Sequence, residues 1–333
     1  MLHRSGSIIG AVLAVLLASS PIARGQTVFE WVDEFPRTDF SQRAIPLKEI
    51  VSDGAVRDSI PPIDDPVFVP VSEAGDVGDL EPVLSIGIEG DFRAYPLRIL
   101  LWHEIVNDVV GGVPVLVSYC PLCNSGVVFD RRLDDEVLEF GNTGRIRHFD
   151  MVMYDKSTES WWQQFLGEAL VGARTGQRLK PLPARLESLA RFRERAPDGK
   201  LLVPNDDTAR PYGETPYEGM DSTPLPPSLA RQRFPYDLPP NVDPLARVVV
   251  VGDEAWTLGL LRATGTLERG DLVLTWVPGQ NSIHDASMIS EGRDVGNVIV
   301  QRRTEDGLVD TPYDVTFAFA FGAFVPAGTL HTE

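Results

Sequence analysis

Alternation of apolar residues with small or polar residues runs through much of this chain and predicts β-strands. The segment from Val83 to Tyr95 alternates in this way on both sides of Glu89-Gly90-Asp91, which is typical of a hairpin. The run from Val113 to Tyr119 is more continuously apolar, as expected for a buried strand. Four later runs are also predicted to be strands: Arg247 to Gly252, Asp271 to Val277, Val298 to Arg302 and Val315 to Phe324.

Helical spacing of apolar residues is rarer. It is found from Leu97 to Val109, and again from Leu186 to Arg195, where Ala196-Pro197-Asp198-Gly199 closes the segment. The chain is therefore predicted to be mainly β, in an α+β arrangement of antiparallel sheets and hairpins with a few peripheral helices.

A proline-rich segment interrupts these patterns. Ten prolines among the 41 residues from 204 to 244 exclude a regular helix or a central strand. Aromatic residues such as Tyr212, Phe234 and Tyr236 are interleaved with the prolines, which favours an ordered, extended segment over a disordered linker. The chain then forms a single domain, or two packed lobes on either side of this segment.

The first 25 residues have the three parts of a secretory signal peptide. His3 and Arg4 precede an apolar run from residue 8 to residue 18, and small residues lead to a predicted cut after Gly25. The apolar run is too short to span a bilayer, so no stable membrane insertion is expected after cleavage and the protein is predicted to be periplasmic or secreted. The rest divides into an N-terminal extension (26–60), a single domain (61–326) and a tail (327–333).

Acidic residues outnumber basic ones along the whole chain. There are 48 Asp and Glu against 30 Lys and Arg, a formal net charge of -18 at pH 7. Removing the signal peptide takes away Arg4 and Arg24 and no acid, which leaves 28 minus 48, or -20. So acidic a chain repels phosphate backbones, and no nucleic-acid partner is expected.

The two cysteines of the chain, Cys120 and Cys123, form its most reactive motif. Such a pair can bind a soft metal, cycle between dithiol and disulfide, or form a structural bridge. In thioredoxin-type enzymes a helix begins at the first cysteine and lowers its pKa, whereas here Asn124-Ser125-Gly126 leads into a predicted strand. A bridge closing so short a loop would add only about 2 kcal/mol of stability. Metal binding is therefore the favoured hypothesis.

A stable metal site needs further ligands, and histidines are the expected source. His103 lies about a dozen residues before the strand that carries the cysteines, and His148 has methionine thioethers nearby that copper(I) would accept. His284, in a polar loop, is a weaker candidate. We expect copper or zinc bound by Cys120, Cys123 and His103, with His148 as a candidate fourth ligand, and no nucleotide cofactor.

Two other functions stay open. A thiol-disulfide oxidoreductase would use Cys120 and Cys123, with His103 as the nearby base and a redox protein as partner. The other is an exported hydrolase or carbohydrate-binding module. Its stacking surface would be formed by Trp161, Trp162, Gln163 and Gln164, and its acid would be Glu104 or Glu168.

The cysteine motif belongs to a longer ordered set of motifs. The set comprises Arg93-Ala94-Tyr95-Pro96-Leu97, Trp102-His103-Glu104-Ile105-Val106-Asn107-Asp108, Tyr119-Cys120-Pro121-Leu122-Cys123, Met153-Tyr154-Asp155 and Phe317-Ala318-Phe319-Ala320-Phe321. It resembles the bacterial and archaeal domain-of-unknown-function family numbered 3179, over roughly residues 60 to 326. The resemblance implies no activity, because that family is uncharacterised. The chain departs from the family pattern at Asn124, where a glycine commonly follows the second cysteine, and at Met220, where an aromatic residue is usual.

Overall fold

The structure, a computed structural model, describes residues 28–52, 54–223 and 225–332. The predicted signal peptide, residues 1–25, lies outside the described residues. Strands make up 40% and helices 16% of the structure, which confirms the predicted mainly β class. Among the described residues, none of the helices is both long enough and apolar enough to cross a bilayer.

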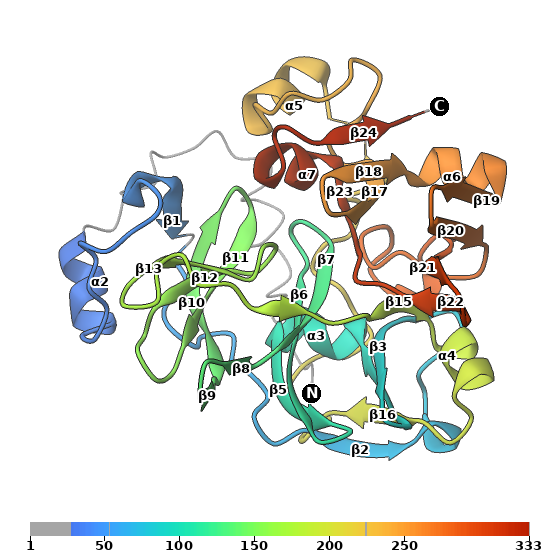
Figure 1. Ribbon diagram of the computed structural model, residues 1–333, viewed down its shortest axis with the longest axis horizontal. Helices are drawn as coiled ribbons and strands as arrows, with labels where there is room; N and C mark the ends of the chain where they lie inside the picture. The colour runs from blue at the N-terminus through green and yellow to red at the C-terminus, as the bar shows by residue number, and fades with distance from the viewer. Residues whose placement is uncertain (1–27, 53, 224, 333) are drawn as a thin grey trace, which may run out of the picture.

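Five sheets of four or five strands are arranged around a common centre, in the manner of a five-bladed propeller (Figure 1). The first sheet has the order β1 (Ile50–Ser52), β10 (Phe140–Arg147), β11 (Asp150–Asp155), β12 (Trp161–Gln163) and β13 (Glu168–Val171). The second has the order β14 (Lys180–Pro181), β7 (Ser125–Asp130), β6 (Val113–Cys120) and β5 (Ile105–Val110). The third has the order β15 (Arg185–Ser188), β3 (Pro82–Ile88), β4 (Asp91–Pro96), β16 (Lys200–Val203) and β2 (Val67–Pro70).

The last two sheets come from the C-terminal part of the chain. The fourth has the order β23 (Asp314–Phe317), β17 (Arg247–Val251), β18 (Glu254–Thr257) and β24 (Thr329–His331), and the fifth the order β19 (Thr266–Arg269), β20 (Leu272–Val277), β21 (Asn297–Thr304) and β22 (Gly307–Asp310). A small sixth sheet pairs β8 (Arg132–Leu133) with β9 (Glu136–Val137). Within these sheets the pairing is antiparallel, except between β16 and β4 and between β18 and β24.

The helices are short and lie outside the sheets. They are α2 (Val28–Glu34), α3 (Leu97–His103), α4 (Leu189–Arg195), α5 (Pro227–Arg233), α6 (Leu258–Thr264) and α7 (Ala318–Phe324). The structure also contains three single-turn 3-10 helices: η1 (Leu47–Glu49), η2 (Val71–Glu73) and η3 (Ile289–Glu291).

The strand predictions are largely confirmed. The hairpin predicted between Val83 and Tyr95 is formed by β3 and β4, and the buried strand after Val113 is β6. The runs beginning at Arg247, Asp271 and Val298 correspond to β17, β20 and β21.

The prediction of a helix from Leu97 to Val109 is wrong beyond His103. Helix α3 ends there because Glu104 adopts a left-handed conformation, with φ of 58°. The β-branched residues that follow, among them Ile105 and Val106, favour the extended conformation of β5. The strand then reverses into β6 through Gly111 and Gly112, both with positive φ, as a two-residue hairpin turn requires.

Two other element boundaries also differ from the prediction. The strand expected from Val315 to Phe324 ends at Phe317, which pairs with Arg247, the first residue of β17. Because the sheet offers no partner beyond that pair, the alanine-containing continuation forms α7 instead. The helix expected from Leu186 begins only at Leu189, since the preceding residues pair with β3 as β15.

The proline-rich segment is ordered against the body, but the exclusion of a helix there was wrong. Helix α5 begins at Pro227, a position where the missing N–H of proline costs nothing. Elsewhere the segment makes ring contacts with the body. Phe234 stacks on Phe319 of α7 with ring centroids 4.3 Å apart, and the Tyr212 ring stacks on His103.

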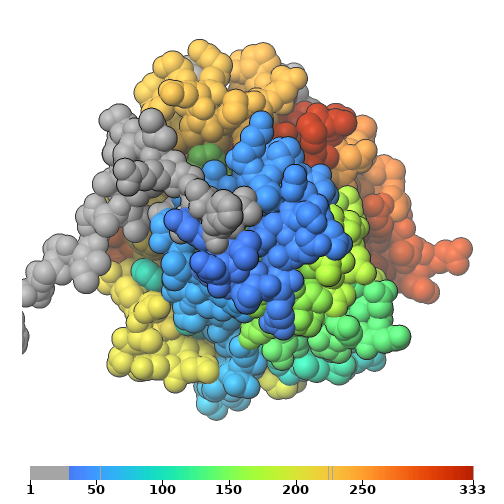
Figure 2. All heavy atoms as spheres, turned by 90° about the vertical axis from the view of Figure 1, so that its left-hand side faces the viewer, coloured from blue at the N-terminus to red at the C-terminus, as the bar shows by residue number. Residues whose placement is uncertain are grey.

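The first described residues, 28–52, cover the first sheet on one side of the molecule (Figure 2, blue). Strand β1 pairs with β10, and Trp31, Phe35 and Phe40 pack around Trp161 with ring centroids 5.1 to 5.2 Å away. This packing buries Trp161 completely.

The predicted carbohydrate-stacking surface does not exist. Its four residues are all fully buried: Trp161, Trp162, Gln163 and Gln164. The Trp162 indole N–H donates to Asp155, so this ring is also part of the interior. Of the two candidate acids, Glu104 is buried beside Asn142 and Glu168 is paired with Arg178.

Candidate metal site

The hairpin formed by β6 and β7 brings the two cysteines together. Cys120 is the last residue of β6 and pairs with Ser125, the first residue of β7. The turn between them ends at Asn124, whose φ of 57° lies in the left-handed region. Asparagine is one of the few residues other than glycine that adopt this conformation readily, so it is suited to this position of the turn. Both cysteines are free thiols.

Residues far along the chain fix this turn through its backbone. The Pro121 carbonyl accepts a hydrogen bond from Nε2 of His284 at 2.7 Å. The Cys123 carbonyl accepts from the N–H of Phe317 at 2.9 Å and from the hydroxyl of Thr316 at 2.6 Å. The position of the sulfur atoms is therefore set by the C-terminal sheets as well as by the local hairpin.

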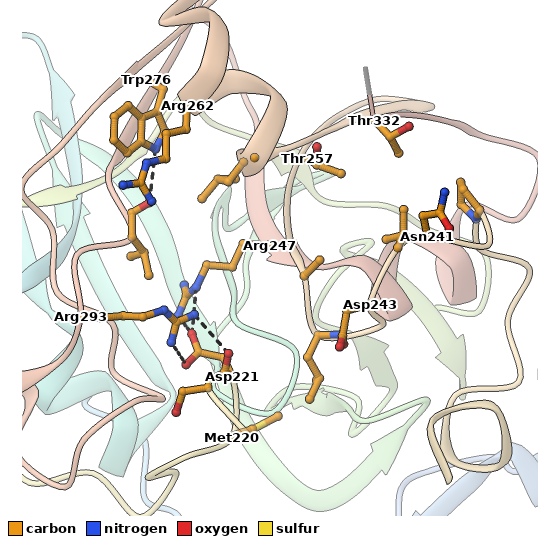
Figure 3. Close-up of a pocket in the computed structure, with 18 of the residues that line it drawn as sticks. Met220, Asp221, Asn241, Asp243, Arg247, Thr257, Arg262, Trp276, Arg293 and Thr332 are labelled. Atoms are coloured by element: carbon orange, nitrogen blue, oxygen red, sulfur yellow. Dashed lines mark hydrogen bonds and ion pairs between the residues drawn. The ribbon is translucent and has the colours of Figure 1, made fainter. Parts of the chain in front are cut away.

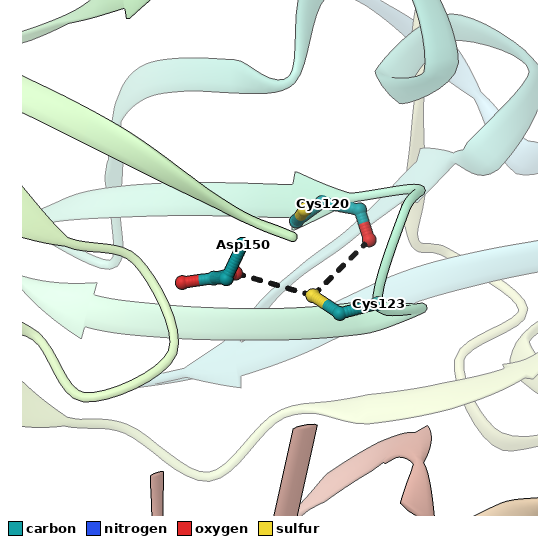
Figure 4. A group of neighbouring side chains, drawn as sticks. All are labelled: Cys120, Cys123 and Asp150. Carbon is teal, nitrogen blue, oxygen red and sulfur yellow. Dashed lines mark hydrogen bonds between the residues drawn. The ribbon is translucent and has the colours of Figure 1, made fainter. Parts of the chain in front are cut away.

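Asp150 completes a group of three potential ligands (Figure 4). It is the first residue of β11, directly after the turn of His148 and Phe149, which both have positive φ (53° and 63°). Its Oδ1 accepts a hydrogen bond from the Cys123 thiol at 3.1 Å. Its Oδ2 accepts from Nε2 of Gln163 at 2.5 Å and from the N–H of Phe165 at 3.0 Å, which fixes the orientation of the carboxyl group.

The ligand atoms of Cys120, Cys123 and Asp150 all lie within 4.8 Å of one another. The cysteines are 2% and 0% exposed and Asp150 is 0% exposed. Burial raises the pKa of the Cys120 thiol and raises that of Cys123 well above its ordinary value. Burial also raises the pKa of Asp150 to about 6, although its hydrogen bonds oppose this. The site therefore disfavours uncompensated negative charge.

A metal cation would supply the missing compensation. Thiolate and carboxylate are both ligands of zinc, and two ligands on one tetrahedral ion with bonds of this type lie roughly 3.5 to 4 Å apart. The three ligand atoms are close to that arrangement, and ion binding would displace the thiol protons. The residues present thus fit a metal ion.

A buried polar network extends from the turn to Asp221. The guanidinium of Arg247 donates to Oδ1 of Asn124 at 3.0 Å, to Nδ1 of His284 at 3.1 Å and to Oδ2 of Asp221 at 2.9 Å. Because Nδ1 of His284 accepts a hydrogen bond and Nε2 donates one, the ring is neutral. Burial and the charge of Arg247 lower its pKa to about 3. Although burial opposes it, Arg247 and Arg293 hold the pKa of Asp221 well below its usual range.

A second buried carboxyl group lies on the other side of the turn. Asp314 accepts hydrogen bonds from Oγ of Ser125 at 2.5 Å and from the N–H of Gly126 at 2.9 Å. Burial raises its pKa to about 6, and the charge of Asp150 acts in the same direction. The cysteine turn is thus flanked by two carboxyl groups that protonate more readily than in water.

Neither of the histidines predicted as ligands belongs to the three-residue group that the described part of the chain forms. In His103, Nδ1 donates to the Pro61 carbonyl and Nε2 accepts from the Tyr212 hydroxyl, both at 2.9 Å. In His148, Nδ1 contacts the Tyr236 hydroxyl at 3.1 Å, and Nε2 lies 3.6 Å from the Glu49 carboxylate. Burial lowers the pKa of both rings.

Sequence reasoning missed Asp150. A signal for it exists, because this acid stands between Phe149 and the apolar run Met151-Val152-Met153. An acid that an apolar strand carries into the interior is paired or coordinates a metal, because an isolated buried charge is too costly, and this marks Asp150 as a candidate ligand.

Comparison with known proteins gives a family but no function. The sequence model of a family described as "Protein of unknown function (DUF3179)" matches residues 57–328. No curated protein and no solved structure matches the chain.

Proposed function

Because the chain belongs to the DUF3179 family, whose description gives no activity, we propose its function from the cysteine site alone: an exported protein that binds one zinc ion through Cys120, Cys123 and Asp150. The observation that carries the proposal is the approach of these three ligand atoms to within 4.8 Å inside a buried cluster. Zinc is preferred to copper(I) because a carboxylate oxygen is an ordinary zinc ligand, whereas copper(I) selects sulfur.

The surroundings of the site support a bound cation. Leu116, Phe129 and Phe140 belong to the same apolar cluster as the two cysteines, so a thiolate formed there would be poorly solvated. The Gln163 amide orients the carboxyl of Asp150, as groups around a metal commonly orient its ligands. The predicted signal peptide supports a location outside the cytoplasm, where free thiols are exposed to oxidants and coordination would protect them.

Protein purified without chelator under reducing conditions is expected to hold about one zinc ion per chain, the stoichiometry of a single mononuclear site. The Cys120→Ser and Cys123→Ser variants are expected to hold none, because each removes a thiolate. Elemental analysis by mass spectrometry measures this, and it also detects copper if copper occupies the site. A metal-free wild-type protein that does not take up added zinc or copper would overturn the proposal.

The identity of the third ligand is tested by a matched set of variants. Asp150→Asn removes the charge and keeps the shape. It is expected to weaken zinc binding by about tenfold or more, since even groups that only orient a metal's ligands contribute that much. His103→Gln and His148→Gln are the controls and are expected to bind zinc as the wild type does. Competition titration with a chromophoric chelator compares them. Loss of zinc in a histidine variant, with Asp150→Asn unaffected, would establish the ligand set predicted from the sequence instead.

Thiol-disulfide exchange is the second candidate function. It is favoured by Oδ1 of Asp150, which lies 3.1 Å from the Cys123 sulfur and can accept its proton. The 2% exposure of Cys120 opposes it, because a partner's disulfide must reach a sulfur atom to react. We expect the metal-free pair not to equilibrate with glutathione buffers. A reversible potential between about -270 and -120 mV, the range of known exchange proteins, would favour this function over zinc binding.

A further inference from the structure

A pocket of about 630 Å³ opens between the end of the proline-rich segment and the two C-terminal sheets (Figure 3). Its walls come from residues 220–223, 239–243 and 245–247, and from helix α6 with the residue before it. The end of β20, residues 293–295 before β21, and Thr332 complete them. The volume lies within the range of about 300 to 1,000 Å³ that is usual for small-molecule sites. Neither the sequence motifs nor the proposed zinc site accounts for it.

Three arginines line this pocket: Arg247, Arg262 and Arg293. The lining also contains three aspartates, Asp221, Asp243 and Asp294, so the partners of each arginine decide which positive charge is available. Two of the three are already engaged, because Arg247 and Arg293 both bind the Asp221 carboxylate, which is fully buried. They therefore stabilise the floor of the pocket.

Arg262 is the arginine that remains available. Its guanidinium lies over the Trp276 ring, 5.6 Å from the centroid, and it forms no ion pair with any residue in the described part of the chain. The ring cannot shift away, because it packs against Gly296, where an added Cβ would lie 2.1 Å from Nε1 of Trp276. The Trp276 indole N–H also donates to the Val295 carbonyl. The pocket thus presents an exposed cation in a fixed orientation.

The other two carboxylates of the lining accept hydrogen bonds from the backbone. Asp294 accepts from the N–H groups of Gly279, Gln280 and Gly296, and Asp243 accepts from the N–H of Leu245. Arg262 lies near enough to Asp294 to help lower the pKa of that carboxyl group. The two side chains form no ion pair in the described part of the chain, so the N–H donors of Arg262 are available to a ligand.

We propose that this pocket binds a small organic anion, a carboxylate or a phosphate ester, whose charged group pairs with the guanidinium of Arg262. The planar fork of arginine matches two oxygens of either group. Apolar side chains in the walls, including Leu258, Val295 and Val242, are suited to contact the uncharged part of the ligand. The proposal goes beyond zinc binding and does not depend on it.

Calorimetric titration of the full mature protein with three probes tests the ligand class. Citrate tests carboxylates, glucose 6-phosphate tests phosphate esters, and glucose is the uncharged control. Binding of citrate or of glucose 6-phosphate, with glucose much weaker, is the expected result, and the tighter anion identifies the charged group. Equal binding of glucose and glucose 6-phosphate, or no binding of either anion, would overturn the proposal.

Two arginine variants then locate the bound anion. Arg262→Gln is expected to weaken anion binding by roughly tenfold or more, the usual effect of losing a charge-assisted hydrogen bond. Arg269→Gln removes an exposed arginine of β19 that pairs with Glu254 outside the pocket, and it should bind as the wild type does. Both variants should unfold at the wild-type temperature and retain zinc. Unchanged affinity in Arg262→Gln would contradict the assignment.

Discussion

Replacement of Arg247 by methionine is expected to lower the free energy of unfolding by about 3 kcal/mol, because it removes one partner of a buried ion pair. The side chain of Arg247 is 7% exposed and that of Asp221 is 0% exposed. Methionine occupies a similar volume but leaves the Asp221 carboxylate with Arg293 as its remaining cation. It also leaves Nδ1 of His284 without its donor. Urea denaturation of the metal-free protein measures the loss.

The same substitution should also impair the zinc site. Arg247 donates to Oδ1 of Asn124, the left-handed residue that closes the cysteine turn, and to His284, which holds the Pro121 carbonyl. Without it the turn is less rigid, and zinc binding by the folded variant is expected to weaken by roughly tenfold, as is usual when groups that orient metal ligands are lost. Competition titration without denaturant, at a temperature well below the unfolding temperature of the variant, separates this effect from the loss of stability.

Two other arginines serve as controls for burial. Arg293→Met removes the second cation from the same carboxylate, but its side chain is 42% exposed, so a loss of about 1 kcal/mol is expected. Arg302→Met breaks an ion pair whose members are 45% and 55% exposed, and it should change stability by less than about 1 kcal/mol. If all three substitutions lower the free energy of unfolding by the same amount, the burial of the Arg247–Asp221 pair does not determine its contribution to stability.

Much of the fold could be predicted because it depends on local patterns. Alternation and turn residues were sufficient to predict the β3–β4 hairpin, and a continuous apolar run was sufficient to predict β6. The failures have a common cause. The sequence from Leu97 onward satisfies a helical pattern through Val109, and only the left-handed conformation of Glu104 ends the helix early. Likewise, β23 stops at Phe317 because its partner strand does, which no local pattern reveals.

The candidate site was predicted only in part, for a related reason. The cysteine pair is local, and a β-hairpin places both of its members. Their third companion, Asp150, comes from another sheet, so its approach depends on how the first and second sheets pack. Histidine was expected on chemical grounds, but both candidate rings have other partners: the Pro61 carbonyl and Tyr212 for His103, and Tyr236 for His148. Whether either of them also serves a metal is decided by the histidine variants.

Two buried groups beside the cysteine turn are expected to give the metal-free protein opposite pH dependences. Burial lowers the pKa of His284 from 6.5 to about 3. Between these two pH values the imidazole ring is protonated in the unfolded state but stays neutral in the native state. Its contribution is complete above pH 6.5 and is lost as the pH falls, by about 2 kcal/mol at pH 5. The pKa of Asp314 is raised from 3.8 to about 6 by burial, so here the native state holds the proton more tightly. Its contribution is complete below pH 3.8 and is lost as the pH rises, by about 3 kcal/mol at pH 7.

Because burial also raises the pKa of Asp150 to about 6, this carboxyl group adds to the contribution of Asp314, and both oppose that of His284. Single variants should reveal the separate contributions. His284→Gln lacks the titrating ring and should lose more stability than the wild type as the pH rises, since Asp314 and Asp150 then act unopposed. Asp314→Asn keeps an acceptor oxygen for Gly126 and should lose less stability than the wild type as the pH rises. Urea denaturation at pH 4, 5, 6 and 7 measures the slopes, with chelator present so that metal binding does not contribute. Changes of slope in the same direction in the two variants, relative to the wild type, would contradict the assignment of these groups.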